Sequence, residues 1–450
     1  MERIRDMALL ITNAKLFDRQ TYADILIEDG KITEVKTQGD GSLVLTEGEE
    51  SGLPAAESQH KRTVPLCSLD AEGLTVAPGL FDMHTHLREP GYEYKEDITT
   101  GAAAAAAGGV TTVCCMPNTS PVADNAETIR YIIEKAQYAR VDVLPYGAIT
   151  IGQAGRELTD FESLLRAGAV ALSDDGNPIQ NAAIARAAMQ KAKELGLVLI
   201  SHCEDAELVG NYALNEGKLS RKMGLPGRPA IAEELMAVRD VMLAAETGAK
   251  LHIAHVSTAG TVEIIRRAKE AGVAVTAETC PHYFSLTEDE IERLGTHARV
   301  NPPLRTAADV AAIIEGLKDG TIDAIATDHA PHAPHEKALP LMEAPSGMIG
   351  LETSLAAALT YLYHTGKFSL AEIMALMSAT PARILGLEAG AIKPGAFADI
   401  VIFDPDEKWV VDSAEFRSKA RNTPYAGKEL RGKVKCTLYR GSIVYTGNED

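Results

Sequence analysis

Two histidines separated by one residue mark the first possible chemistry in this chain. His84 and His86 lie in the segment DMHTHLREP, directly after the apolar run TVAPGLF, which predicts a buried strand. Side chains at positions i and i+2 of a strand point the same way, so both imidazoles can reach one cation. Neutral imidazole nitrogens are common ligands of zinc-like ions. The pair alone is weak evidence, because two histidines at a strand end are more often hydrogen-bonded residues than ligands.

Further potential ligands follow later apolar runs, each where a strand would stop. They are Asp174 and Asp175 in VALSDDG, His202 in LVLISHCED, His255 in LHIAHVST, and Asp328, His329 and His332 in AIATDHAPH. Their joint appearance at the same end of successive strands predicts a metal site. His252 is different, because alternation turns it to the face opposite His255, and we predict a packed or hydrogen-bonded side chain there.

The apolar runs alternate with helix-like segments, which is typical of parallel strands buried on both faces. Candidate strands lie at residues 76–81, 110–115, 141–149, 169–172, 197–200, 251–253, 273–277 and 324–326. This pattern predicts an α/β fold, a (β/α)8 TIM barrel, whose catalytic groups gather at the carboxyl ends of the strands. The ligand candidates follow the first, fourth, fifth, sixth and eighth of these strands.

Short strand-like segments flank the barrel on both sides. LLITNAKLF and ADILIEDGKITEVK precede it, the second with a hairpin turn at Asp29 and Gly30, and ADIVIFDP, KWVVD and KVKCTLYRGSIVYTG follow it. We therefore predict a small β-sandwich domain built from residues 1–76 and 389–450 around a barrel over residues 77–388. Residues 39–65 are polar and rich in Gly and Glu, which predicts an exposed insertion.

Composition narrows the class of protein. The chain has 46% apolar residues and a net charge of −19, which indicates a soluble globular protein that repels nucleic acids and anionic membranes. Six cysteines without CxxC spacing indicate reduced thiols and a cytoplasmic location. The apolar run at residues 7–11 is too short for a signal peptide. Residues 98–123 lack charges, but Gly, Thr, Asn and Pro interrupt them, so we expect an Ala-rich helix and a strand, not a membrane span.

A carboxylate after the fourth strand can bridge two cations held by histidines of the first, fifth and sixth strands. A water shared by such cations is acidified enough to act as hydroxide near neutral pH. Asp328, after the eighth strand, is placed to bind one cation and contact that water. We therefore predict that it is the general base, and later the acid that protonates the leaving nitrogen. The alternative for Asp328 is a helix N-cap.

Several segments together resemble one family of enzymes. DMHTHLREP and ATDHAPHAPHEK, with CMPNTSP, SHCED, AHVST and ARVNPPLR, closely resemble segments of bacterial dihydroorotases of type I in the amidohydrolase superfamily. The resemblance runs from about residue 9 to the last strand, apart from the acidic insertion. It implies the reversible cyclisation of N-carbamoyl-L-aspartate to L-dihydroorotate, the third step of de novo pyrimidine synthesis, on the barrel fold.

The resemblance also implies a ligand set for one or two zinc ions. The ligands would be His84, His86, Asp175, His202, His255 and Asp328. Asp175 is preferred to Asp174 because the residue directly before the glycine is the bridge in the similar branch, although strand alternation does not decide between them. Hydantoinases and one branch of dihydroorotases bridge their metals with a carboxylated lysine, and VALSDDGNP contains none.

Arg88 lies two residues past His86 on the same side of the chain, and a guanidinium suits the substrate's carboxylates. The alternative is a salt bridge at the rim of the site, with Glu89 or Glu93. The resemblance implies substrate contacts at His86, Arg88, Asn118, Asn301, His332, Ser346 and Gly347. Residues 333–345, rich in proline and charge, predict a mobile lid or an ordinary surface loop.

Two other functions stay open on the sequence. One is a hydantoinase-like or allantoinase-like cyclic amidase, against which the missing lysine, Arg88 and Asn118 argue. The other is an inactive paralogue that scaffolds aspartate transcarbamoylase; such paralogues lose metal-binding histidines, and all six expected ligands are present here. The resemblance further implies a homodimer, and an active enzyme could also associate with aspartate transcarbamoylase.

Overall fold

The computed structural model describes residues 8–19, 21–37 and 66–447. The predicted insertion at residues 39–65 lies outside these ranges. Among the described residues, no helix is both long enough and apolar enough to cross a bilayer. The uncharged stretch expected to be a helix and a strand forms α1 (Ile98–Ala107) and β7 (Val110–Cys115).

Eight parallel strands form a closed barrel, as predicted. In order around the barrel they are β6 (Leu80–Thr85), β7, β8 (Asp142–Pro145), β9 (Leu172–Ser173), β10 (Val198–Ser201), β13 (Lys250–Ile253), β14 (Val275–Thr279) and β15 (Ala324–Ile325). Bridges between Gly147 and Leu172 and between Thr85 and His329 join the two sheets into one ring. Small and apolar side chains, including Met83, Ile200 and Ala326, fill its interior.

Helices follow the strands and cover the outside of the barrel. After the first seven strands come α1, α2 (Ala126–Ala136), α3 (Phe161–Ala167), α4 (Ala182–Glu194), α7 (Ile231–Thr247), α8 (Ala259–Glu270) and α11 (Ala307–Lys318). After β15 come α13 (Ser354–Ala358), a π-helical turn (Leu359–Tyr363), α14 (Leu370–Met374), a second such turn (Ala375–Ala379) and α15 (Thr380–Ile384). The loops carry α5 (Ala206–Val209), β11 (Leu214–Asn215), α6 (Lys218–Met223), β12 (Gly227–Arg228), α9 (Pro281–Ser285), α10 (Glu290–Leu294) and α12 (Pro334–Lys337).

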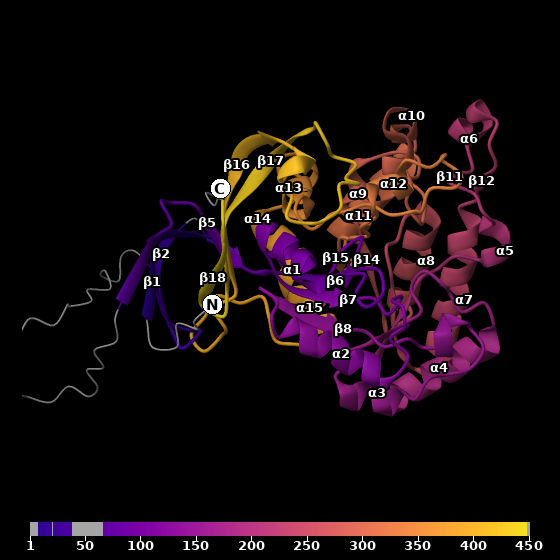
Figure 1. Cartoon of the computed structure of the whole chain (residues 1–450), viewed down its shortest axis with the longest axis horizontal. Coiled ribbons are helices and arrows are strands. Elements are labelled where there is room, and N and C mark those ends of the chain that lie inside the picture. The colour runs from indigo at the N-terminus through magenta and orange to yellow at the C-terminus, as the bar shows by residue number, and fades with distance from the viewer. Residues whose placement is uncertain (1–7, 20, 38–65, 448–450) are drawn as a thin grey trace, which may run out of the picture.

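Both ends of the chain meet in one eight-stranded sheet beside the barrel (Figure 1). Its strands are β1 (Ala8–Leu16), β2 (Tyr22–Glu28), β3 (Lys31–Thr37), β4 (Leu66–Asp70), β5 (Thr75–Pro78), β16 (Ile400–Val410), β17 (Glu429–Tyr439) and β18 (Ser442–Thr446). They share one apolar core that includes Ile11, Ile25 and Ile400. The β-domain predicted from the two terminal segments is therefore confirmed, and its boundaries after residues 76 and 388 stay predictions.

The predicted hairpin joins β2 and β3 at Asp29 and Gly30. Both residues have positive φ, 50° and 74°, which is the backbone that a two-residue hairpin turn requires.

One predicted strand was wrong in its extent. The apolar run at residues 76–81 is not a single barrel strand, because Thr75–Pro78 pairs with β1 and β16 in the terminal sheet and the first barrel strand is β6. The chain changes sheet at Gly79, where a Cβ atom would clash with the side chain of Thr111.

Candidate metal centre

The six predicted ligands gather at one end of the barrel. His84 lies within β6 and His86 directly after it, Asp175 follows β9, and His202 follows β10. His255 follows β13 and Asp328 follows β15. All six side chains are buried, and all lie at the carboxyl ends of their strands, where catalytic groups of this barrel collect.

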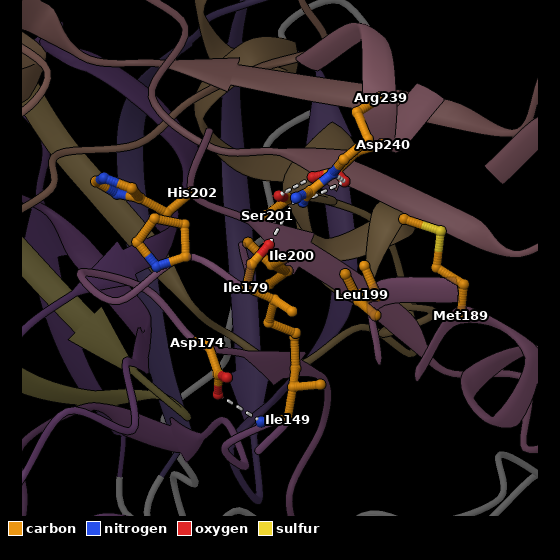
Figure 2. A pocket seen from close by; sticks show the side chains of 12 residues that line it. Ile149, Asp174, Ile179, Met189, Leu199, Ile200, Ser201, His202, Arg239 and Asp240 are labelled. Carbon is orange, nitrogen blue, oxygen red and sulfur yellow. Dashed lines mark hydrogen bonds and ion pairs between the residues drawn. The ribbon is translucent and has the colours of Figure 1, made fainter. Parts of the chain in front are cut away.

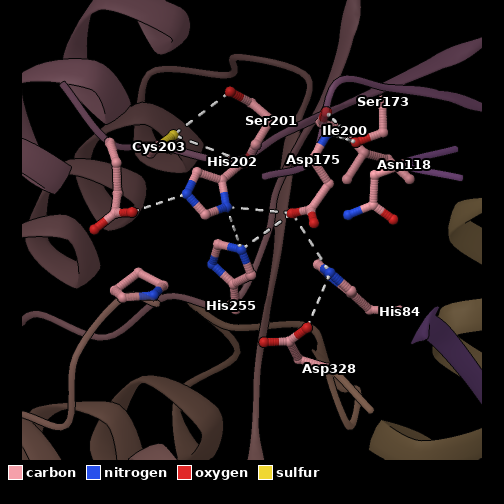
Figure 3. A network of polar contacts seen from close by, with 12 residues as sticks. His84, Asn118, Ser173, Asp175, Ile200, Ser201, His202, Cys203, His255 and Asp328 are labelled. Carbon is pink, nitrogen blue, oxygen red and sulfur yellow. Dashed lines mark hydrogen bonds and ion pairs between the residues drawn. The ribbon is translucent and has the colours of Figure 1, made fainter. Parts of the chain in front are cut away.

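The carboxylate of Asp175 lies among four histidines, of which Figure 3 shows His84, His202 and His255. Its Oδ1 atom is 3.2 Å from Nδ1 of His202 and 3.3 Å from Nε2 of His255. The same atom is 3.5 Å from Nε2 of His84, and Oδ2 is 3.5 Å from Nε2 of His86. Burial raises the pKa of Asp175, but the surrounding histidines hold it well below its usual range. An ionised carboxylate among imidazole nitrogens is a suitable bridge between two cations.

Asp174 turns away from this centre. Its Oδ1 accepts hydrogen bonds from the backbone N–H groups of Ile149 and Thr150, and its Oδ2 accepts one from the Thr150 hydroxyl. The side chain lines a small cavity beside Ile179 and Ile200 (Figure 2). Of the two neighbouring aspartates, only Asp175 contacts the histidines.

Asp328 completes the cluster from the opposite side. Its Oδ1 atom is 3.0 Å from Nε2 of His86 and 3.5 Å from Nε2 of His84. Burial raises its pKa, whereas the hydrogen bond with His86 and the charges of the histidines lower it below its usual range. Asp328 also has a φ of 48°, and Arg88 and His255 have φ values of 64° and 35°. Such backbone strain in residues other than glycine often occurs at functional sites.

The donor set fits divalent cations. Two groups of buried donors, His84 with Asp175 and His255, and His84 with His86 and Asp328, place their ligand atoms within 4.8 Å of one another. Nε2 of His84 and Nδ1 of His255 are buried without a hydrogen-bond partner. Buried polar atoms rarely stay unpaired, so Nε2 of His84, which lies 3.5 Å from both Asp175 and Asp328, is consistent with metal ligation, whereas the nitrogen of His255 that lies near Asp175 is Nε2. His202 belongs to neither group, and its Nδ1 lies 2.8 Å from Nε2 of His255.

Arg88, His332 and Ser346 form a second cluster. Nε of Arg88 donates to the carbonyl oxygen of Pro331, and its Nη2 lies 3.5 Å from Nε2 of His332. That histidine nitrogen lies 2.9 Å from the carbonyl oxygen of Ser346. Burial and the Arg88 charge lower the pKa of His332 to about 2, so the ring is neutral. Gly347 has a φ of 142°, and a Cβ there would lie 2.8 Å from that of Ala330, so a side chain does not fit.

The two asparagines are placed differently. Oδ1 of Asn118 lies 3.0 Å from Nδ1 of His86, which ties this predicted substrate residue directly to a predicted ligand. Asn301 makes no hydrogen bond to the other predicted site residues in the described chain, and its Oδ1 is buried without a partner.

No described ion pair includes Arg88, whereas Glu89 pairs with Lys135. The predicted alternative, a salt bridge of Arg88 at the rim of the site, is therefore not formed.

Sequence reasoning missed the residues that support the site. Lys337, in α12, is buried and donates to the carbonyl oxygens of Pro345 and Gly347. Asn422, from the segment between β16 and β17, donates to the Gly347 carbonyl and accepts from the backbone N–H of His332. The signal for Lys337 was a basic residue at the end of the segment APHAPHEK, whereas nothing marked Asn422.

Behind the centre, Glu278 in β14 contacts His84. Its Oε1 atom lies 2.5 Å from Nδ1 of His84; burial raises the pKa of Glu278, but the charges and hydrogen bonds of His84 and His252 lower it to about 2. Its only signal was an acidic residue inside the apolar run VTAETC.

A closed parallel barrel with buried histidines and aspartates at the carboxyl ends of its strands, in groups that could hold a metal ion, is the arrangement of the amidohydrolase class. The family model described as dihydro-orotase-like matches residues 73–261. A dihydroorotase of Syntrophus aciditrophicus is 47% identical over 424 residues, which are 94% of this chain and 99% of that protein. One from Pelotomaculum thermopropionicum is 49% identical, covering 97% and 98% of the two chains. The chain belongs to the dihydroorotase family.

Solved structures share the whole fold. The L-hydantoinase (dihydropyrimidinase) of Arthrobacter aurescens superimposes with a TM-score of 0.83 at 26% identity, covering 98% of this chain and 96% of that one. The dihydropyrimidinase of Brevibacillus agri NCHU1002 superimposes with a TM-score of 0.81 at 24% identity, covering 98% of this chain and 96% of that one. At this identity the similarity shows the fold alone. The predicted barrel with its terminal β-domain is therefore the architecture of the cyclic amidohydrolases.

Proposed function

We propose that the protein is a zinc-dependent dihydroorotase, which interconverts N-carbamoyl-L-aspartate and L-dihydroorotate in pyrimidine synthesis. The observation that carries this proposal is the carboxylate of Asp175 among four histidines, with Asp328 opposite it. The family's name supports the choice of substrate. An aspartate in place of a lysine after strand β9 separates the chain from the hydantoinase-like alternative.

The proposed metal ligands are the six buried side chains at the strand ends. His84, His86, His202 and His255 supply nitrogens, and Asp175 and Asp328 supply oxygens, a mixture that zinc accepts. When bound, divalent cations would acidify a water and polarise the amide carbonyl of the substrate. One or two ions fit this set, because His84 belongs to both groups of donors.

Asp328 is the proposed proton carrier. Its pKa is low, so at neutral pH the carboxylate is free to accept a proton. In ring opening it takes the proton of the attacking water and gives it to the leaving ring nitrogen. In ring closure it takes a proton from the carbamoyl nitrogen and gives it to the departing oxygen. The side chain is buried and lies beside His86, so few groups other than the substrate can exchange a proton with it.

The substrate is held by groups on two sides of the centre. The Arg88 guanidinium, with no described ion pair, is available for a substrate carboxylate. Asn118, Asn301 and the neutral His332 supply further hydrogen bonds, and His86 lies between Asn118 and Asp328. The backbone of Ser346 and Gly347 is proposed to contact the ring.

Location and assembly are proposals of the same kind. We propose a cytoplasmic enzyme that acts on small molecules as a homodimer, without nucleic-acid or membrane partners, and that can associate with aspartate transcarbamoylase. The net charge of −19 supports the exclusion of anionic polymers and lipids.

The test is turnover by the full chain supplied with zinc. L-dihydroorotate and N-carbamoyl-L-aspartate are each offered as substrates, hydantoin is offered as a competitor, and the ring's ultraviolet absorbance is followed. Turnover of dihydroorotate that disappears in Asp328→Ala supports the proposal. Preference for hydantoin would favour the cyclic-amidase alternative, and inactivity at full metal content would favour the scaffold alternative.

A further inference from the structure

Glu278 is a buried acid that no step of the proposed reaction uses. It lies in β14, the seventh strand of the barrel, and its side chain is fully buried. Its Oε1 atom is 2.5 Å from Nδ1 of His84. Its Oε2 atom is 3.4 Å from Nε2 of His252, whose other nitrogen lies 2.8 Å from the hydroxyl of Thr276. The carboxylate therefore lies between one predicted ligand and one histidine below the centre.

The contact decides which nitrogen of His84 faces the centre. A carboxylate accepts hydrogen bonds, so Nδ1 of His84 carries the proton and donates to Glu278. Nε2 is then the nitrogen with a free lone pair in the neutral ring. That atom lies 3.5 Å from both Asp175 and Asp328 and has no hydrogen-bond partner.

His84 is also the residue that both groups of donors share. An error in the orientation or tautomer of its ring would affect both groups. The carboxylate of Glu278 is buried in the barrel core, where an ionised group is costly unless it is paired, and its partner here is the ring of His84. A role in aligning His84 accounts for a charge at this position.

We propose that Glu278 is a positioning residue, which fixes the His84 ring with Nε2 toward the metal centre. This inference rests on the proposed function, because it requires that His84 is a ligand. Acceptors behind ligand histidines typically contribute 10- to 100-fold to metal affinity. Because His84 belongs to both donor groups, Glu278 would align a ligand that the two groups share.

The first test compares zinc affinity in full-length variants by competition with a chromophoric chelator. Glu278→Gln keeps the size of the side chain and removes its charge, and Glu278→Leu also removes the acceptor. We expect zinc to bind about 10-fold weaker in the first and up to about 100-fold weaker in the second. Asp240→Asn is the matched control, since Asp240 is an equally buried carboxylate that contacts Ser201 and Arg239 but no predicted ligand.

Unchanged zinc affinity in folded Glu278→Gln and Glu278→Leu would overturn the inference, and so would an equal loss in Asp240→Asn. A His84→Ala variant separates this outcome from failure of the proposed function. If wild type and His84→Ala bind zinc equally weakly, the metal site itself is wrong. If His84→Ala loses zinc while the Glu278 variants do not, only the positioning role is wrong.

The second test needs no Glu278 variant and so does not depend on its folding. The zinc-loaded wild-type chain, labelled with ¹⁵N-histidine, is studied by NMR, and the His84 signals are assigned by their loss in His84→Ala. We expect a proton on Nδ1 and a metal-shifted Nε2 signal. A proton on Nε2 would show that the ring faces the metal with the other nitrogen, which refutes the inference.

Discussion

Asp175→Asn and Asp174→Asn are a matched pair that tests the bridge of the proposed metal centre. Both variants replace a buried carboxylate by an amide of equal size, one residue apart. Asp175 touches four histidines, whereas Asp174 accepts only from Ile149 and Thr150. At about 4 Å and an effective dielectric constant of about 20, one pair of unit charges contributes about 4 kcal/mol. This energy corresponds to about a thousandfold change in a binding constant. The loss of affinity for a divalent cation is at least as large.

We therefore expect zinc to bind at least about 10³-fold weaker to Asp175→Asn, and about equally to wild type and Asp174→Asn. Zinc content after dialysis, measured by mass spectrometry, and chelator competition give the affinities. Thermal unfolding of the metal-free proteins controls for folding, because the amide oxygen of Asp174→Asn can still accept from the N–H groups of Ile149 and Thr150 and only the bond from the Thr150 hydroxyl to Oδ2 is lost. Loss of zinc from Asp174→Asn with retention by Asp175→Asn would refute the assignment.

Three further predictions concern catalysis and stability. Asp328→Asn, assayed with zinc in excess because Asp328 is also a proposed ligand, should lower kcat about 10²- to 10⁴-fold, and a kcat within threefold of wild type would contradict its role as proton carrier. Arg88→Lys should lower kcat/KM for N-carbamoyl-L-aspartate about 10- to 100-fold, because an ammonium replaces the planar fork; equal steady-state constants would exclude a carboxylate contact. Burial raises the pKa of Glu352 to about 7, so its contribution to stability is complete below its ordinary value of 4.5 and disappears as the pH rises to 7. This loss is at most about 3 kcal/mol, so Glu352→Gln should show a shallower fall in urea stability between pH 5 and 7, and parallel curves would contradict it.

The strands and their ligands were predictable because burial and chemistry leave local marks. A parallel strand buried on both faces is a short apolar run, and His202 or His255 at its end interrupts that run with a polar residue. The choice between Asp174 and Asp175 had no such mark. Alternation along one strand does not fix which carboxylate faces histidines from three other strands, and the resemblance to the family supplied what the pattern could not.

Other features depend on contacts between distant segments. The run at residues 76–81 belongs to two sheets, which differ in their partners and not in their composition. Glu278 acquires a role only when β14 meets His84 across the barrel, and Asn422 only when the C-terminal segment reaches the loop at Gly347. Each would look like an ordinary polar residue in the sequence.

The pairing of β5 with β16 also sets an order of events during protein synthesis. Val76 leaves the ribosome long before its partner Ile402, so one edge of β5 stays open while the whole barrel is made. An open strand edge is a template for pairing with other chains, and this one continues through Gly79 into the strand that carries His84. β16, which is translated after the whole barrel, therefore covers the open edge of β5, and a nascent chain that stops before residue 400 would carry an exposed edge directly attached to the strand with His84.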